Sequence, residues 1–313
     1  MSFSPDNTPD IPDEVSADPL ENQTAVVAPA KPRVWTLFVS SLLVLVMMVV
    51  LQAVAAVVIL ITQVARGQSI KEVAETLPSL MMTPPIFVMT IALSGLGTTA
   101  GALLFGWISA KHANCSVGER LGMRWPEIST FSLLTFLLGS IPVLLVSIGA
   151  VYLVALVFPA DDSLLSLYEN MTTGWAVVFI ITIGVLPGIG EELFFRGFFQ
   201  RRMLQRYRPW VAIGVTSVVF GLFHITPHGI ALATIIGVWL GVIAWRTNSI
   251  WPSACCHAFI NSGWNVYQVG RFHWGIPTVP PIWFSIIGGA VILAAFATSV
   301  WILLKMEPRS IET

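Results

Sequence analysis

The central stretch of this chain is Pro187-Gly188-Ile189-Gly190-Glu191-Glu192-Leu193-Phe194-Phe195-Arg196. A proline followed by two glycines predicts that the helix beginning near Trp175 breaks here. The helix then restarts with the two glutamates in its first turn, where the helix dipole favours negative charge. Broken backbone inside an apolar environment is tolerated only where it is buried in protein or lines a wet cavity. The stretch therefore predicts a polar cavity beside Glu191 and Glu192.

The composition around this stretch excludes a water-soluble enzyme. Of the 313 residues, 55% are hydrophobic and 11% are charged, whereas soluble proteins carry about 25% charged residues. A bilayer core of about 30 Å needs roughly 20 helical residues. The sequence contains long blocks without Asp, Glu, Lys or Arg, and each block holds at least one such crossing. The block Pro209–Trp245 holds two short ones. The blocks are Val34–Ala65, Thr76–Ala110, Ile128–Ala160, Asn170–Gly190, Pro209–Trp245, Thr247–Gly270 and Phe272–Leu304. The predicted fold is all-α, a polytopic membrane helical bundle of about eight transmembrane helices with a broken helix at its functional site.

Four segments are expected along the chain. Residues 1–33 are rich in proline and acidic residues and lack a hydrophobic period, which predicts a disordered acidic cytoplasmic tail. Residues 34–160 hold the N-terminal transmembrane helices. Residues 170–270 form the membrane domain that contains the central stretch, and residues 271–313 form the C-terminal transmembrane helix and a short tail.

The basic residues predict an orientation in the membrane, because Lys and Arg near helix ends favour the cytoplasmic side. The most basic stretch lies between Arg196 and Arg208, whereas the loop around Asp161, Asp162 and Glu169 contains no Lys or Arg. Placing that loop outside puts both termini in the cytoplasm. We therefore expect an integral, multi-pass membrane protein with both termini in the cytoplasm. Because the sequence shows no eukaryotic targeting signal, we expect the membrane to be a bacterial plasma membrane.

The central stretch also distinguishes its two glutamates. Glu192 and Arg196 are four residues apart with the acid first, the favourable order for an ion pair on a helix. Glu191 is left without a local counter-charge and is a candidate general base. The alternative is that both side chains simply extend to the cytoplasmic interface. An ionisable group at membrane depth is, however, a functional candidate by default.

Two histidines on other apolar segments could complete a site. Phe220 and His224 share a helix face, as do His257 and Asn261, because each pair is four residues apart. Glu191 with His224 could take a proton from water while His257 and Asn261 stabilise an oxyanion. Alternatively, Glu191, His224 and His257 could hold a divalent metal such as zinc. The residues leave open whether a cofactor is needed, and both versions predict hydrolysis inside the membrane.

Three ordered motifs make the chain resemble the CAAX protease and bacteriocin-processing family, CPBP, also called the Abi family. The motifs are Glu-Glu-x-x-x-Arg at Glu191, Glu192 and Arg196, Phe-x-x-x-His at Phe220 and His224, and His-x-x-x-Asn at His257 and Asn261. The resemblance implies a CAAX prenyl endopeptidase-like intramembrane protease with its catalytic domain in residues 170–270. It implies catalytic roles for Glu191, His224, His257 and Asn261, with Glu192, Arg196 and Phe220 supporting them. Members are described both as metalloproteases and as glutamate-dependent proteases.

The expected partners are the lipid bilayer and a membrane-embedded or membrane-associated protein or peptide substrate, and no nucleic acid. Two other classes fit the same cavity, a small-solute transporter and a non-catalytic scaffold or immunity protein. A transporter predicts helix repeats, and the Glu-Glu motif has no counterpart in the first four spans. Straight helices would place His224 deeper than Glu191, since about fourteen residues precede it in its helix. The predicted break at Pro187 would draw Glu191 towards it.

Overall fold

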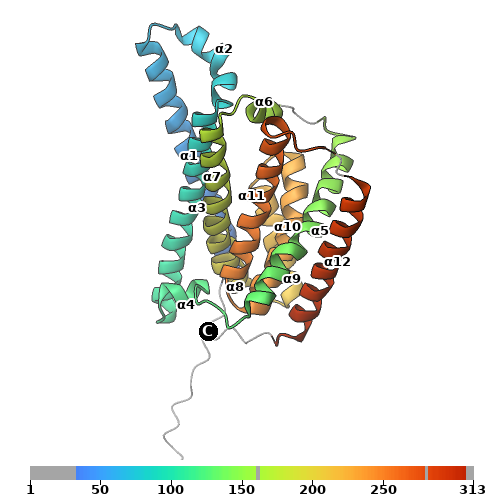
Figure 1. Ribbon diagram of the computed structural model, residues 1–313. Helices are drawn as coiled ribbons and strands as arrows, with labels where there is room; N and C mark the ends of the chain where they lie inside the picture. Colours follow the sequence, from blue (N-terminus) through green and yellow to red (C-terminus); the bar gives the residue numbers. More distant parts are fainter. Residues whose placement is uncertain (1–32, 160–162, 279–280, 308–313) are drawn as a thin grey trace, which may run out of the picture. The chain divides into compact units, whose positions relative to one another are not determined.

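The computed structural model describes residues 33–159, 163–278 and 281–307. The predicted disordered tail, apart from Arg33, and the acidic pair at residues 161 and 162 lie outside the described residues. Regular structure in the described part is helical throughout (Figure 1). The elements are α1 (Trp35–Ala65), α2 (Ile70–Met81), α3 (Pro84–Ala113), α4 (Val117–Leu121), α5 (Thr130–Ala155), α6 (Ser163–Glu169), α7 (Thr173–Glu192), the π-helix η1 (Leu193–Gln200), α8 (Arg201–Leu204), α9 (Pro209–Leu222), α10 (Pro227–Thr247), α11 (Trp251–His273) and α12 (Ile282–Lys305).

Six helical segments in the described residues are long and apolar enough to cross a bilayer: α1, α3, α5, α10, α12 and the continuous segment Thr173–Leu204. The expected number of eight is not confirmed. Helix α9 has 14 residues, about 21 Å at 1.5 Å per residue, which is shorter than a bilayer core of about 30 Å. Helix α11 has 23 residues but is rich in polar side chains. The multi-pass membrane character of the chain is clear from the six spans.

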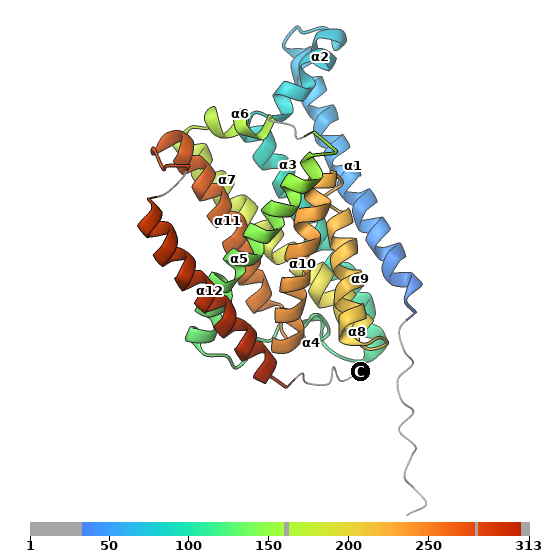
Figure 2. The same ribbon diagram turned by 90° about the vertical axis from the view of Figure 1, so that its right-hand side faces the viewer.

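The helices pack into a bundle in which α7 contacts α3 on one side and α11 on the other, while α5 contacts α10 and α12. Figures 1 and 2 show α2 and α6 at one end of the bundle and α4 and α8 at the other. Helix α1 begins and α12 ends at the α4 and α8 end (Figure 2). A chain that starts and finishes at the same end of a bundle crosses it an even number of times. Which end is cytoplasmic stays a prediction.

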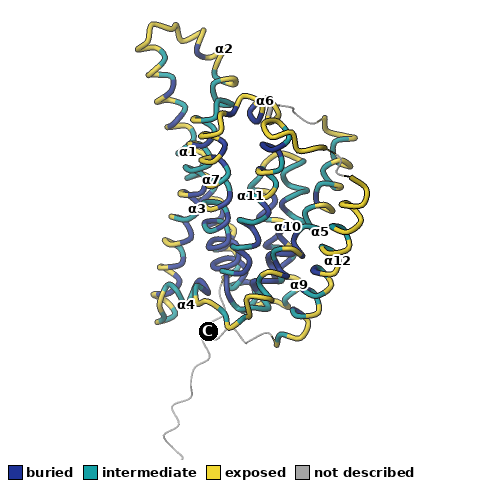
Figure 3. The backbone as a smooth tube through the Cα atoms, viewed as in Figure 1, coloured by how far each residue is buried: buried dark blue, intermediate teal, exposed yellow. Residues whose placement is uncertain are grey.

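Burial is concentrated around the central stretch. All eight residues of η1 are buried, and Figure 3 shows the dark, buried backbone gathered in the interior near α8. The outward faces of α1, α5 and α12 carry exposed apolar side chains such as Leu42, Val146 and Leu293. Apolar side chains are suited to face lipid, whereas the polar groups of a membrane protein must find partners inside it.

The predicted break at Pro187 is wrong. Helix α7 continues through Pro187 to Glu192, and the irregular backbone comes immediately afterwards as η1. A proline removes the hydrogen bond to the carbonyl four residues earlier, here that of Ile183. The side-chain amide of Asn261 on α11 donates to this carbonyl, with Nδ2 and O 3.2 Å apart. A neighbouring helix therefore supplies the missing partner, and the helix tolerates its proline.

The glycines of the central stretch serve close helix packing. A Cβ on Gly188 would lie 3.1 Å from Cβ of Ala258 on α11. A Cβ on Gly190 would lie 2.7 Å from the backbone carbonyl oxygen of Gly95 on α3. Because a backbone atom cannot rotate away, this second contact requires glycine at residue 190. The two glycines let α7 approach both neighbours and bring Glu191 to the junction of the three helices.

We expect Gly190→Ala to destabilise the protein by about 1–3 kcal/mol, the usual cost of overpacking. The added methyl group would push α7 away from α3 at the Gly95 carbonyl. The measurement is the free energy of unfolding in detergent. Gly263→Ala on α11 is the matched control, because nothing lies within 4 Å of the new Cβ. Equal stability of the two variants would contradict the packing role of Gly190.

Candidate active site

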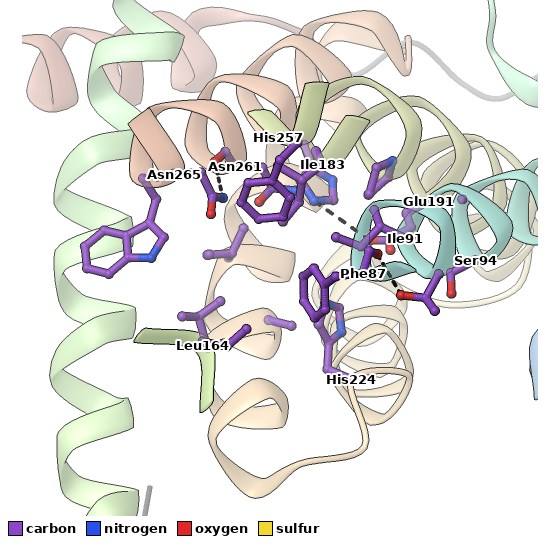
Figure 4. Close-up of a pocket in the computed structure, with 18 of the residues that line it drawn as sticks. Phe87, Ile91, Ser94, Leu164, Ile183, Glu191, His224, His257, Asn261 and Asn265 are labelled. Carbon is purple, nitrogen blue, oxygen red and sulfur yellow. Dashed lines mark hydrogen bonds and ion pairs between the residues drawn. The ribbon is translucent and has the colours of Figure 1, made fainter. Parts of the chain in front are cut away.

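The central stretch opens onto a cavity of about 520 Å³ inside the bundle. Glu191, His224, His257 and Asn261 all line it. Figure 4 shows these four side chains around the cavity, with Glu191 and His257 joined by a contact and His224 on another wall. Much of the remaining wall is apolar. The four predicted catalytic residues are thus brought together around one space from α7, α11 and the turn after α9.

Glu192 is buried in a polar cluster below this cavity. Its Oε1 lies 2.9 Å from Nη1 of Arg196, the ion pair that the four-residue spacing predicts. The same Oε1 lies 3.0 Å from Nδ1 of His257. Arg196 also donates from Nη2 to the carbonyl oxygen of Gly237 on α10, at 3.0 Å. A buried carboxylate needs such partners to remain charged, and the cluster holds η1, α10 and α11 together.

The contact with Glu192 determines which nitrogen of His257 faces the cavity. A carboxylate oxygen accepts hydrogen bonds, so Nδ1 of His257 carries the proton on that side. The other nitrogen, Nε2, lies 3.8 Å from Oε2 of Glu191, too far for a direct hydrogen bond. For Nε2 to donate as well, the ring must carry both protons.

Glu191 differs from its neighbour in exposure and in partners. Its side chain is 20% exposed, whereas that of Glu192 is fully buried. Among the described residues it forms no direct ion pair with Lys or Arg; Nε2 of His257 lies 3.8 Å from its Oε2, and Arg196 interacts with it electrostatically at longer range. Glu191 therefore presents a carboxylate to the cavity that is free to interact with water or a ligand.

Phe220 supports three of the polar side chains. Its ring centroid lies 5.1 Å from that of His224 and 5.8 Å from that of His257, both edge to face. The guanidinium carbon of Arg196 lies 4.5 Å from the same ring, within the range of a cation–π interaction. The predicted supporting role of Phe220 thus has a physical form, because one aromatic ring fixes the positions of both histidines.

His224 reaches the cavity because α9 is short. Helix α9 ends at Leu222, and His224 lies in the turn that leads into α10. Its Nδ1 lies 3.1 Å from the carbonyl oxygen of Phe220, so this nitrogen is the donor. In the neutral ring, Nε2 then carries a lone pair. The next residue, Ile225, has φ +62°, a strained value for a β-branched residue, and it holds this tight turn.

Asn261 has a structural contact as well as a place on the cavity wall. One of its two amide hydrogens is used by the carbonyl oxygen of Ile183. This contact fixes the amide orientation, because a carbonyl cannot donate. Asn265, one turn further along α11, donates to the backbone oxygen of Asn261 at 2.7 Å and accepts from the hydroxyl of Tyr168. The second amide hydrogen of Asn261 remains available to a ligand.

The candidate metal ligands do not form a ready-made metal site. Within the described ranges, no group of three or more His, Cys, Asp or Glu side chains is arranged to hold a metal ion. Zinc sites need ligand atoms about 2.0–2.3 Å from the ion. Glu191, His224 and His257 share the cavity wall without converging in this way.

Sequence reasoning missed several residues of the cavity. Gln52 of α1 and Ser94 of α3 belong to the helices before the central stretch, Tyr168 belongs to α6, and Trp264 and Asn265 lie on α11. Gln52 had a visible signal, since it is a polar residue in the middle of the apolar block Val34–Ala65. The others had no signal that separates them from ordinary polar or interfacial residues of a membrane protein.

The comparison with known families gives one match. Residues 173–263 match the family described as type II CAAX prenyl endopeptidase Rce1-like. The match includes Glu191, Glu192, Arg196, Phe220, His224, His257 and Asn261. It confirms the resemblance to the CAAX-type membrane proteases over this segment, and it gives no support to the Abi designation or to a metalloprotease. No curated protein and no solved structure matches the chain.

The contact between Asn261 and Ile183 predicts a coupling with Pro187. We expect Asn261→Leu to destabilise the protein by about 1–3 kcal/mol, because a buried carbonyl loses its partner. In a Pro187→Ala background, the new N–H of residue 187 can bond to Ile183, so the same substitution should cost less. The measurement is a double-mutant cycle of unfolding free energies in detergent. Equal costs in both backgrounds would show that Asn261 does not compensate for the proline.

Proposed function

We propose that this chain is an intramembrane endopeptidase that hydrolyses a peptide bond of a membrane-associated protein or peptide. The observation that carries the proposal is the cavity around Glu191, where a carboxylate that forms no ion pair with a described Lys or Arg faces two histidines and an asparagine inside a bundle of membrane spans. The family match over residues 173–263 supports it, because that family is described as an endopeptidase.

In this proposal, Glu191 activates the water. Its carboxylate accepts one proton, and the hydroxide oxygen attacks the carbonyl carbon of the peptide bond. His224 assists by accepting a hydrogen bond from the same water at Nε2, the nitrogen left free by its contact with Phe220. The apolar walls exclude bulk water, which strengthens these interactions during the reaction.

The developing oxyanion would be stabilised by His257 and Asn261. His257 donates from Nε2 when its ring carries both protons, while its Nδ1 stays hydrogen-bonded to Glu192. Asn261 contributes its second amide hydrogen, since the first is used by Ile183. Arg196 neutralises Glu192 and keeps that carboxylate from accepting the water proton. The supporting residues thus leave Glu191 as the base.

The tetrahedral intermediate collapses when the C–N bond breaks. The proton held by Glu191 passes to the leaving nitrogen, which departs as an amine, and the other product is a carboxylic acid. One water is consumed and Glu191 returns to its carboxylate form. The proposed sequence contains no metal step.

We expect Glu191→Gln to reduce cleavage by at least about 10²-fold, the lower range for loss of a general base. The assay uses purified protein in liposomes with two probes, a peptide with a farnesylated C-terminal Cys-aliphatic-aliphatic-X sequence and an unmodified single-span peptide. Mass spectrometry detects the products. Unchanged cleavage by the variant would exclude Glu191 as the base. Cleavage of neither probe by the wild-type protein would contradict the proposed function and favour a scaffold or transporter.

Stability separates this effect from misfolding. Glu191→Gln should unfold like the wild-type protein, because the side chain is partly exposed and has no arginine partner. Glu192→Gln should cost about 3–5 kcal/mol, since it leaves the charge of Arg196 buried without compensation. The unfolding free energies of both variants in detergent test this contrast. A destabilised Glu191→Gln would make its loss of activity uninformative about catalysis.

We expect the activity to resist metal removal, because the three candidate ligands do not converge. The test is cleavage of the same probe after treatment with a zinc chelator, with the metal content of the purified protein measured in parallel. A loss of activity that added zinc restores, together with zinc at equal stoichiometry, would show a metalloprotease.

A further inference from the structure

A glutamine near the middle of α1 carries an amide into the cavity. Gln52 donates both of its amide hydrogens to α3, to the carbonyl oxygen of Thr90 and to Oγ of Ser94, each at 2.8 Å. All three residues line the same cavity as Glu191. They lie outside residues 173–263, the segment that matches the endopeptidase family.

Two polar groups of this pair remain available. The amide oxygen of Gln52 has no hydrogen-bond partner among the described residues, and neither has the hydroxyl hydrogen of Ser94. Both N–H groups of Gln52 are used, which fixes the direction of its amide and identifies Oε1 as the free atom. The pair therefore offers one acceptor and one donor, fixed side by side on the wall of the cavity.

Gln52 and Ser94 lie on the same side of the cavity as Glu191. Gly95, the neighbour of Ser94, packs against α7, since a Cβ there would lie 2.8 Å from Cβ of Leu186. The carbonyl oxygen of Gly95 is also the atom that approaches Gly190, the neighbour of Glu191. Figure 4 shows Ser94 and Glu191 on the same side of the cavity.

An acceptor beside a donor matches the N–H and C=O of one residue in an extended peptide, because these two groups point to the same side of the backbone. A peptide that enters a membrane cavity brings N–H and C=O groups that lose their water, and each unsatisfied group costs a few kcal/mol. We propose that Gln52 and Ser94 bind the backbone of one extended substrate residue, with Oε1 of Gln52 accepting from its N–H and the hydroxyl of Ser94 donating to its C=O. This inference rests on the proposed endopeptidase function.

A structural role alone predicts something different. If Gln52 only joined α1 to α3, its substitution would change stability and leave the affinity for substrate unaltered. Gln52→Met keeps the length of the side chain and removes the amide. Gln63→Met makes the same change in the same helix at a residue that does not line the cavity, so it is the matched control.

The first experiment compares kcat and KM of these variants on whichever of the two model peptides the wild-type protein cleaves. We expect Gln52→Met to lower kcat/KM by roughly 3- to 10-fold, the value of one neutral hydrogen bond, mainly through KM. Gln63→Met should match the wild-type protein. A wild-type kcat/KM for Gln52→Met would overturn the inference while the proposed function stood.

A second experiment uses the unmodified protein and changes the substrate. Ester analogues of the peptide, each with one backbone N–H replaced by oxygen, are tested at the amide bonds that flank the cleaved one. With the wild-type protein, kcat/KM for one of these analogues should fall by a similar factor. In Gln52→Met that analogue and the parent peptide should have the same kcat/KM, because both changes remove the same hydrogen bond. Additive losses at every bond tested would overturn the inference. Cleavage of neither model peptide would instead reject the proposed function and this inference with it.

Discussion

The buried ion pair between Glu192 and Arg196 is the interaction on which the centre of the bundle depends. Two charges without water are costly unless close partners compensate them. Here Oε1 of Glu192 contacts both Arg196 and His257, while Arg196 reaches the carbonyl of Gly237 and lies against the ring of Phe220. One pair thus fixes parts of α7, η1, α9, α10 and α11 relative to one another. Removing either partner would disturb all of these contacts at once.

The same pair separates two adjacent carboxylates into different roles. Glu192 is neutralised and enclosed, whereas Glu191 faces the cavity without an arginine partner. The distinction comes from helix geometry, because adjacent residues point about 100° apart and only one of them can face Arg196. His257 lies between the two, with Nδ1 near Glu192 and Nε2 towards Glu191. The different roles of Glu191 and Glu192 thus come from their surroundings, because the two side chains are chemically identical.

The parts of the structure that the sequence predicted are those governed by local spacing. The Glu192–Arg196 pair, the helical class and the membrane spans follow from four-residue offsets and from the length of apolar blocks. The predicted break at Pro187 was wrong because local rules count the hydrogen bond that proline removes from Ile183. They cannot include the replacement donor Asn261, which lies 78 residues beyond Ile183 in the chain. The irregular segment Leu193–Gln200 contains no proline, and its single glycine, Gly197, does not by itself mark a π-helix. The eight expected spans were not confirmed because α9 is short and α11 is polar. These same properties serve the candidate site, since the short α9 leads into the turn with His224 and the polar α11 carries His257 on the cavity wall.

The division of the cavity between two parts of the chain has a consequence for specificity. Glu191, His224, His257 and Asn261 all lie within the segment that matches the endopeptidase family. Gln52, Phe87, Ile91 and Ser94 come from α1 and α3, and Leu164 and Tyr168 come from α6, all outside that segment. The matched segment alone leaves one side of the cavity uncovered, so the surrounding helices decide its width and its polar contacts. Substitutions in α1, α3 or α6 can therefore change which ligand fits the cavity while leaving the groups around Glu191 in place.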